Sequence, residues 1–266
     1  MSKKPIGVFD SGVGGLTILR ELKKQFPHED FIYFGDTAHV PYGTKSKKTV
    51  TQYAAGITHF LQTQQVKLII VACNTASALA LPALRKNFPI PILGVIEAGA
   101  RAAVNATQNG KIAILGTNAT INSKAYVKSL LRLEKNLKII QQACPLFVPI
   151  VEANWQKKPA ADLIAREYLA PVIKNGTDTV ILGCTHYPLL KTTLSKILGK
   201  QVKLIDSATT LATQTRNILI KNRQAQTEGK GKTVFFASDE PARFKKMAEQ
   251  ILQAPIGKVT LKKLNG

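Results

Sequence analysis

The sequence has few cysteines and no long apolar run. Its three cysteines, Cys73, Cys144 and Cys184, are an odd number without close spacing, which argues against a disulfide framework and matches no zinc-binding pattern. The apolar runs are far shorter than the roughly 18 residues that suggest a membrane span. The opening residues MSKKPIGVFD lack the apolar stretch of a secretory signal. We therefore expect a soluble, cytoplasmic protein with no metal site and no membrane partner.

Acidic residues are also scarce. The chain carries 37 Lys and Arg against 16 Asp and Glu, a net charge of +21, and such an excess suggests nucleic acid or an acidic membrane surface as a partner. The excess is spread along the chain, with +11 in residues 1–190 and +10 in residues 191–266. No basic patch interleaved with aromatic residues stands out. We therefore do not expect nucleic acid to be the principal partner, whereas a positive field would help to gather a small anionic substrate.

Nucleotide-binding loops are missing as well. Gly12, Gly14 and Gly15 in DSGVGGLT follow an apolar run, but the third glycine of G-x-G-x-x-G would fall at Thr17. No G-x-x-x-x-G-K-[ST] loop exists either. The sequence therefore predicts neither a dinucleotide site nor an ATP site. A tight turn whose backbone amides approach a carboxylate is an alternative interpretation of these glycines.

What the sequence does have is an alternation of short apolar runs with segments of helical periodicity. The composition, 45% hydrophobic and 20% charged, is that of a globular protein large enough for one or two domains. The alternation is typical of βα units and predicts an α/β fold with a mainly parallel sheet. The predicted strands are 6–9, 31–34, 68–72, 111–115, 137–140, 179–182, 203–205 and 233–237. The predicted helices are 16–25, 48–64, 77–87, 99–107, 120–133, 159–175, 188–198, 208–222 and 241–252.

The residues just after each strand are the first candidates for a site. Ligands of open α/β sheets bind beyond the carboxyl ends of the strands, where helix N-termini offer unpaired amides. Two of these segments are alike, LIIVACNTAS and TVILGCTHYP, and each is preceded by a comparable stretch, IGVFDSG or IAILGTN. The spacing within each pair is also similar, with 63 residues from Asp10 to Cys73 and 67 from Thr117 to Cys184. The simplest interpretation is two similar α/β halves, each with a thiol at a strand end.

Cys73 and Cys184 can be either packing residues or reactive thiols. Their matched positions at predicted helix N-termini, where the local field lowers a thiol pKa, favour chemistry, and Cys144 lacks this context. An enzyme that uses one cysteine as its nucleophile would give the second thiol no role. A pair of cysteines that forms a disulfide needs its Cα atoms within about 7 Å of each other. A two-base reaction uses both, because a thiolate removes a proton from one face of a carbon and a thiol returns one to the other face.

Three other positions have two interpretations each. Asp10, directly after the apolar IGVF, is either a helix cap or a buried carboxylate that accepts a proton. His186, two residues after Cys184, either packs or transfers protons near neutral pH. Tyr42-Gly43 lies on a loop rich in proline and glycine, and such loops often carry function.

Six blocks resemble, in the same order, the motifs of the glutamate racemases, a branch of the aspartate/glutamate racemase superfamily. The blocks span nearly the whole chain and are IGVFDSGVGGLT, YFGDTAHVPYGTKS, VACNTASA, GVIEAGARAA, CPLFVPIVE and LGCTHYPLL. The pair CNT and GCTH is typical of the superfamily, and DSGVGGLT with VPYG is typical of the glutamate branch. Two positions depart from the pattern: His39 replaces an arginine of D-T-A-R-x-P-Y-G, and Ala98 replaces the proline of E-P-G.

This resemblance implies two similar α/β domains with mainly parallel, doubly wound sheets that face each other across a central active-site cleft. The second domain, 97–206, is inserted in a first domain made of 1–96 and 207–266. The implied activity is the cofactor-independent interconversion of L- and D-glutamate, which supplies D-glutamate for bacterial peptidoglycan. The alternatives are a racemase of a related amino acid such as aspartate, or a secondary role in binding DNA or gyrase, because some members of the family inhibit gyrase.

The resemblance also implies the roles of single residues. Cys73 would act on the D-enantiomer and Cys184 on the L-enantiomer, with Asp10, His186 and Glu152 assisting the two thiols. The implied substrate contacts are Asp10, Ser11, Tyr42, Gly43, Asn74, Thr75, Thr185 and His186. We expect a homodimer with no cofactor. We expect no segment before the first motif that binds a peptidoglycan-precursor activator.

Overall fold

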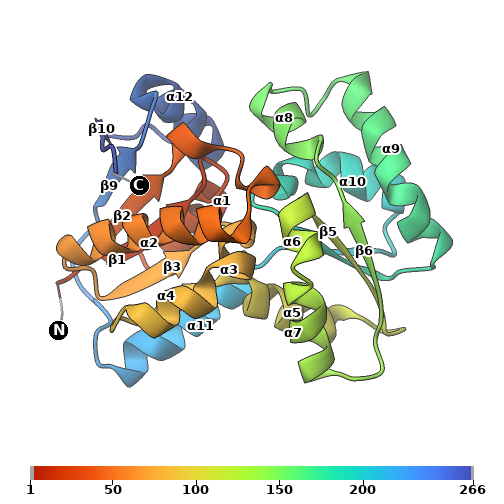
Figure 1. The fold of residues 1–266 in the computed structure, drawn as a ribbon, viewed down its shortest axis with the longest axis horizontal. Helices are drawn as coiled ribbons and strands as arrows, with labels where there is room; N and C mark the ends of the chain where they lie inside the picture. Colours follow the sequence, from red (N-terminus) through yellow and green to blue (C-terminus); the bar gives the residue numbers. More distant parts are fainter. Residues whose placement is uncertain (1–2, 265–266) are drawn as a thin grey trace.

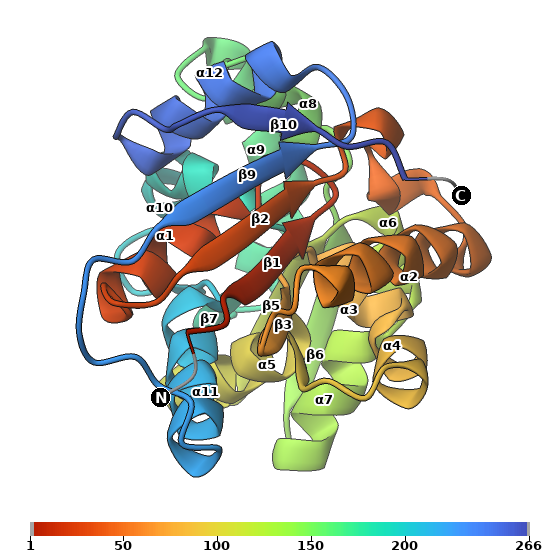
Figure 2. The same ribbon diagram turned by 90° about the vertical axis from the view of Figure 1, so that its left-hand side faces the viewer.

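The computed structural model describes residues 3–264, which form two lobes, each built around one parallel β-sheet (Figure 1). The sheet of the first lobe has the strand order β10-β9-β2-β1-β3-β4, and Figure 2 shows β10, β9, β2 and β1 side by side. The sheet of the second lobe has the order β6-β5-β7-β8. Neighbouring strands pair in parallel in both sheets. The predicted doubly wound α/β class is therefore confirmed.

Strands and helices alternate along almost the whole chain. The strands are β1 Ile6–Asp10, β2 Phe31–Gly35, β3 Leu68–Val71, β4 Ile92–Gly94, β5 Lys111–Gly116, β6 Lys138–Ala143, β7 Thr179–Gly183, β8 Lys203–Ile205, β9 Thr233–Ala237 and β10 Val259–Leu261. The α-helices are α1 Leu16–Gln25, α2 Lys47–Thr63, α3 Asn74–Leu79, α4 Leu81–Asn87, α5 Val95–Ala106, α6 Asn118–Asn122, α7 Ala125–Leu133, α8 Phe147–Glu152, α9 Pro159–Lys174, α10 Lys191–Leu198, α11 Ala208–Lys221 and α12 Pro241–Leu252. Short 3₁₀ helices cover Thr37–His39, Tyr42–Thr44 and Tyr187–Leu190.

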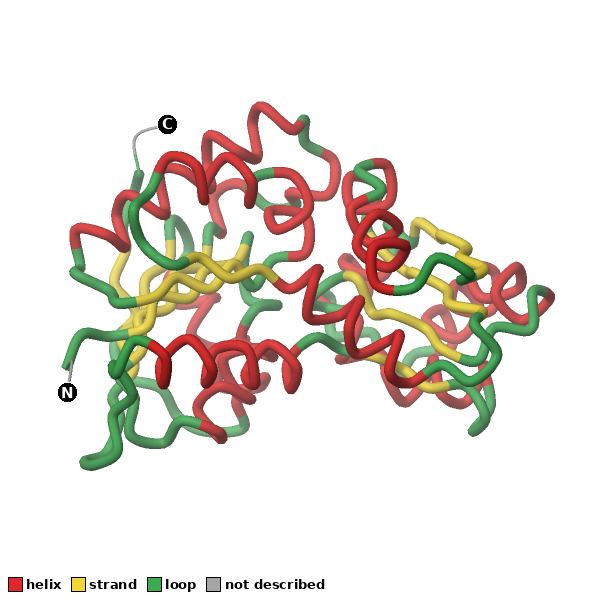
Figure 3. The backbone as a smooth tube through the Cα atoms, turned by 90° about the horizontal axis from the view of Figure 1, so that it is seen from below, coloured by secondary structure: helices red, strands yellow, loops and turns green. Residues whose placement is uncertain are grey.

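Both faces of each sheet are buried, which explains why the strands are continuous apolar runs. In β1, Ile6 and Val8 pack against α1, α11 and α12, whereas Phe9 packs on the opposite face against α2, α3 and α4. In the second lobe, β5 and β7 pack against α8, α9 and α10 on one face and against α5 and α7 on the other. Figure 3 shows helices on either side of the strands in both lobes.

The two sheets share one topology, and it determines where their functional edges lie. The chain runs from β1 outward to β2 and then returns to β3 on the other side of β1, and β5, β6 and β7 repeat this order. In open α/β sheets the ligand crevice lies beyond the carboxyl ends of the strands at such a reversal. Asp10 ends β1 and Cys73 follows β3, whereas Thr117 follows β5 and Cys184 follows β7. The two cysteines therefore occupy equivalent positions in the two lobes.

Several predicted elements differ from the structure in their bounds. The predicted helix 77–87 is two helices, α3 and α4, and α3 begins at Asn74. The predicted helix 120–133 is also two, α6 and α7, because Lys124 has a left-handed backbone with φ of 55°. The predicted helix 99–107 begins earlier, at Val95. The strands β4 and β10 have three residues each, and the helix α8 has six with Pro149 among them, so none of the three carries a clear periodic signal and none was predicted.

The strands β5 to β8 all belong to the second sheet, so the second lobe is an insertion between β4 and β9 of the first. This arrangement is consistent with an inserted domain over 97–206. The boundaries themselves stay a prediction, and the first one would fall inside α5.

Candidate active site

The carboxyl edges of the two sheets meet at a small cavity of about 20 Å³. Its walls come from the loop after β1, the loop 40–43, the segment after β3 and the segment after β7. The lining residues are Ser11, Val40, Pro41, Tyr42, Gly43, Cys73, Asn74, Thr75, Thr117, Val148, Cys184, Thr185 and His186. Both candidate thiols therefore line one cavity, from opposite lobes.

Cys73 is 5% exposed and caps the N-terminus of α3. Its Sγ accepts a hydrogen bond from the backbone N–H of Ala76 at 3.4 Å and donates to the hydroxyl of Ser11 at 3.7 Å. Burial and the negative charge of Asp10 raise the pKa of this thiol to about 12, and the bonds to Ala76 and Ser11 offset only part of this effect. The sequence-based expectation that a helix N-terminus lowers the pKa is therefore wrong for Cys73, because burial outweighs the field of a helix of six residues.

Asp10 ends β1, the strand that pairs with β3, and has no exposed surface. Its carboxylate accepts hydrogen bonds from the backbone N–H of Gly12 at 3.0 Å and from the hydroxyl of Thr185 at 3.3 Å. Burial raises the pKa of Asp10, and the charge of His186 together with these hydrogen bonds opposes the rise. Asp10 is thus the buried carboxylate of the two interpretations above, and it is not a helix cap.

Cys184 has a chain of partners within its own lobe. Its Sγ lies 3.9 Å from Nδ1 of His186, and Nε2 of His186 lies 3.2 Å from Oε1 of Glu152. This second contact is an ion pair by distance, but the N–H does not point well at the oxygen, so it is not a well-aligned hydrogen bond. Burial alone would lower the pKa of His186, but the contacts with Cys184 and Glu152 and the charge of Asp10 outweigh it and raise the pKa to about 10. The negative groups around His186 therefore favour its cationic form.

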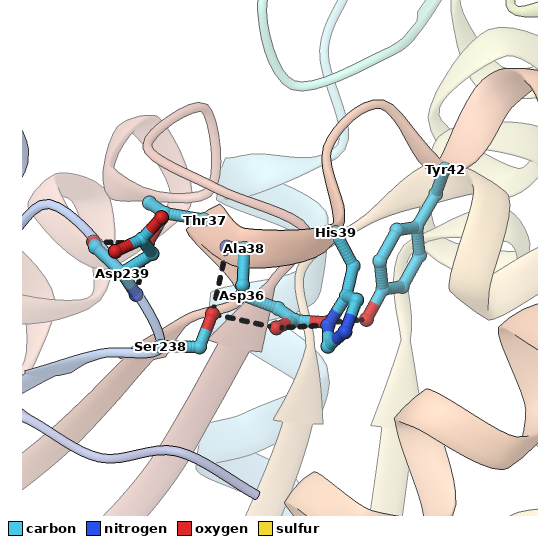
Figure 4. A network of polar contacts seen from close by, with 7 residues as sticks. All are labelled: Asp36, Thr37, Ala38, His39, Tyr42, Ser238 and Asp239. Atoms are coloured by element: carbon cyan, nitrogen blue, oxygen red, sulfur yellow. Dashed lines mark hydrogen bonds and ion pairs between the residues drawn. The ribbon is translucent and has the colours of Figure 1, made fainter.

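The loop that carries Tyr42 and Gly43 is held from outside the cavity. Asp36, at the end of β2, accepts hydrogen bonds from the hydroxyl of Tyr42, from Ser238 at 2.7 Å and from Nδ1 of His39 at 2.9 Å (Figure 4). The ring of His39 also stacks on Tyr53, with 4.0 Å between the ring centroids. Because the Tyr42 hydroxyl points at Asp36, this residue can offer a substrate only its backbone.

Asn74 and Thr75 connect the two lobes. The hydroxyl of Tyr126 in α7 donates to Oδ1 of Asn74 at 2.7 Å, and the hydroxyl of Thr75 lies 2.9 Å from that of Thr117 and 3.2 Å from that of Thr120. These contacts fix the orientation of both side chains at the cavity wall. They also hold the lobes in a closed arrangement.

Most of the predicted site residues come together. Seven of the eight predicted substrate contacts line the cavity, and Asp10 lies behind it in contact with Thr185. Glu152 does not line this cavity and reaches it through His186. Thr117 and Val148 are cavity residues that were not predicted as site residues. Thr117 follows β5 and lies in one of the comparable stretches, whereas nothing in the sequence pattern marks Val148.

Within residues 3–264, no group of three or more His, Cys, Asp or Glu side chains is arranged to hold a metal ion. No helix in this part of the chain is both long and apolar enough to cross a membrane.

Two doubly wound lobes of one topology, each with one thiol at a shared cavity, define an α/β protein whose candidate site lies between its lobes. Residues 6–215 match the Asp/Glu/Hydantoin racemase family. The glutamate racemase of Geobacter metallireducens is 48% identical over 260 residues, covering 97% of this chain and 96% of that protein. The solved glutamate racemase RacE1 of Bacillus anthracis has a TM-score of 0.93 at 37% identity, with 98% of this chain and 97% of that chain covered.

A second solved structure resembles the whole chain. The glutamate racemase of Francisella tularensis, determined in complex with D-glutamate, has a TM-score of 0.94 at 38% identity and covers 100% of this chain and 99% of its own. The chain belongs to the Asp/Glu/Hydantoin racemase family. It is an amino-acid racemase.

Proposed function

We propose that this enzyme interconverts L- and D-glutamate by a two-base reaction in which Cys73 and Cys184 are the bases and no cofactor takes part. The observation that carries the proposal is the single cavity lined by one thiol from each lobe. A substrate carbon held between them would have one sulfur on each face. The curated and solved relatives described above, which are named glutamate racemases, support glutamate as the substrate.

The proton transfers balance without an oxidant or a reductant. Starting from L-glutamate, a Cys184 thiolate takes the Cα proton while the electrons of the broken bond stay on the carbon. The S–H bond of Cys73 then breaks, and its proton forms the new bond on the opposite face. Cys184 is left as a thiol and Cys73 as a thiolate, which is the state that the reverse reaction requires.

The surroundings of each thiol suit these roles. A pKa of about 12 keeps Cys73 protonated at neutral pH, so it is ready to donate a proton, and the buried Asp10 is near enough to help it lose one in the other direction. Cationic His186, 3.9 Å from the sulfur of Cys184, can stabilise negative charge on that sulfur. Asn74, Thr75, Thr185 and the backbone at Tyr42 and Gly43 are the groups we propose to hold the carboxylates.

The test is solvent exchange with single-thiol variants. Wild-type enzyme in D₂O should place deuterium at Cα of the product from either enantiomer. Cys73→Ala and Cys184→Ala should each lose racemisation by a factor of about 10³ or more, because one proton transfer has no partner. We expect Cys184→Ala to retain exchange at Cα of D-glutamate only, and Cys73→Ala of L-glutamate only. The matched control is Cys144→Ala, because Cys144 is equally buried but lies outside the cavity. Full racemisation by either active-site variant would overturn the two-thiol reaction.

Aspartate is the competing substrate within the same class. The solved aspartate racemases that resemble this chain are only 18–20% identical, which supports the fold but not the substrate. Racemisation rates for glutamate, aspartate and their amides decide between the two. A higher kcat/KM for aspartate would replace glutamate as the substrate.

The proposal also covers the location, the oligomeric state and a second role of the enzyme. We propose a cytoplasmic homodimer that supplies D-glutamate to peptidoglycan, and light scattering in solution tests the dimer. The net charge of +21 is the one feature that favours a second role in binding DNA or gyrase. DNA affinity that falls steeply with salt is expected for such a role, and no binding near physiological salt would eliminate it.

A further inference from the structure

A second cavity, of about 80 Å³, lies beside the active site and joins the lobes at another point. It is lined by Gly12, Val13, Thr37, Val40, Glu152, Glu240, Arg243, Phe244 and Met247. Glu152 ends α8 of the second lobe, whereas Glu240, Arg243, Phe244 and Met247 belong to the start of α12 in the first lobe. Figure 1 shows α8 and α12 at the top of the molecule, on either side of the boundary between the lobes. The C-terminal helix of one lobe thus faces the carboxylate that pairs with His186 in the other.

The charged groups around Glu152 are few. His186 contacts it from its own lobe at 3.2 Å. Across the cavity, α12 presents Arg243 and Glu240. The other residues that line this cavity and the adjoining groove at Val40, Pro41, Asn118 and Pro145 carry no titratable group. Arg243, whose side chain is exposed, is therefore the one cation among the residues that line this cavity.

We propose that Arg243 is a positioning residue of the reaction: its charge, on the first lobe's side of this cavity, favours the ionised form of Glu152, which pairs with His186, and His186 in turn contacts Cys184. This inference rests on the proposed two-thiol reaction. It adds a residue that touches neither the substrate cavity nor either thiol. Because Arg243 and Glu152 belong to different lobes, their attraction is also complete only when the lobes are closed.

The electrostatics of Glu152 agree with this role. The contact with His186 lowers the pKa of Glu152, partial burial opposes the change, and the charges of His186 and Arg243 lower it further. The side chain of Glu152 is 27% exposed, so solvent screens the effect of Arg243 and the contribution is modest and sensitive to salt. Loss of Arg243 should raise the pKa of Glu152 and so extend the protonated form to higher pH.

The experiment compares Arg243→Gln with Arg243→Lys and with Lys246→Gln, which removes an exposed cation from the same helix away from the cavity. Because two enantiomers have equal free energy, kcat/KM must be the same in both directions. A difference between the directions can therefore appear only in kcat and in KM, which are measured separately. For Arg243→Gln we expect a roughly twofold to fivefold lower kcat, an acidic limb of the pH profile moved to higher pH, and a weaker response to salt than in the wild type. Arg243→Lys should restore most of the loss.

An NMR titration gives a readout that does not depend on activity. The chain has four histidines, so the His186 ring signals can be assigned and followed through the ionisation of Glu152. In Arg243→Gln this inflection should move to higher pH. An unmoved inflection and an unmoved pH profile in an active enzyme would overturn the role of Arg243, as would an equal effect of Lys246→Gln. Failure of the proposed function would appear separately, as a wild-type enzyme that places no deuterium at Cα.

Discussion

At the scale of one residue, the buried carboxylate of Asp10 lowers the stability of the folded chain. It is fully buried and its pKa is raised, because burial disfavours the ionised carboxylate in the folded chain. The same carboxylate helps to keep Cys73 protonated, because its negative charge is the second cause of the raised thiol pKa. A buried carboxylate next to a thiol costs stability, and the proposed proton transfer accounts for its presence.

Asp10→Asn should stabilise the protein while inactivating it. A group whose pKa is raised by folding contributes most stability below its unfolded pKa, and that contribution is lost as the pH rises through its folded value. At neutral pH the amide removes this cost and keeps an oxygen for the N–H of Gly12. We expect Tm to rise by roughly 2–4 °C per kcal/mol gained, and this advantage should disappear on acidification. A Tm unchanged at both pH values would contradict the explanation.

The sequence predicted most of the residues that line the cavity, but not how their side chains are oriented. The rule that sites lie after strands pointed to Asp10, Cys73 and Cys184 without any coordinates. It could not show that the Tyr42 hydroxyl turns away to Asp36, since that contact joins the loop to the end of β2. Nor could it connect Arg243 with Glu152, which are 91 positions apart in the chain and line one cavity only because α12 of one lobe faces α8 of the other.

At the scale of elements, the glycine-rich turn between β1 and α1 is built to receive the other lobe. A Cβ atom at Gly14 would lie 2.3 Å from Oγ1 of Thr185 and 2.7 Å from Nδ1 of His186, both closer than contact allows. The tight turn predicted from DSGVGGLT thus exists. Because Gly14 has no side chain, the turn leaves room for Thr185 and His186, which follow β7.

Gly14→Ala should impair catalysis more than stability. The added methyl group must displace Thr185 and His186 or keep the lobes apart, and small displacements of catalytic groups cost roughly 10- to 100-fold in kcat/KM. The matched control is Gly56→Ala in α2, where a Cβ atom meets nothing within 4 Å and helix propensity favours alanine by up to about 1 kcal/mol. Steady-state kinetics and thermal unfolding of both variants provide the measurement. An active Gly14→Ala enzyme would show that this approach of the lobes is not needed.

The elements with a strong periodic signal were predicted, whereas the short elements β4, β10 and α8 were not, although the equally short β8 was. Strands buried on both faces, such as β1, β3 and β7, are clear in the sequence because apolar residues dominate each of them. Helix α8 spans six residues and contains Pro149, so neither length nor composition indicates a helix. This omission matters for function, because α8 carries both Val148 and Glu152.

At the scale of the whole molecule, the two similar stretches around the cysteines were enough to predict two lobes of one topology. The distance between the lobes was not predictable, because it depends on contacts between side chains that belong to different repeats. Here the lobes are closed: Thr75 and Thr117 touch, as do Asn74 and Tyr126. The cavity between the thiols, about 20 Å³, has room for little more than one water molecule. An amino acid can therefore reach both sulfurs only if the lobes first separate.

A cross-link between the lobes should stop turnover reversibly. The hydroxyls of Thr75 and Thr117 are 2.9 Å apart, so the double variant Thr75→Cys with Thr117→Cys places two thiols within reach of a disulfide. We expect the oxidised form to lose nearly all racemisation and dithiothreitol to restore it to the level of its own reduced form. Non-reducing peptide mapping verifies that positions 75 and 117 are the linked pair. Each single variant, treated with the same oxidant and reductant, controls for oxidation of Cys73 and Cys184. Because closed lobes exclude substrate, an oxidised double variant that turns over at its reduced rate would mean that glutamate reaches the thiols by a route that needs no opening.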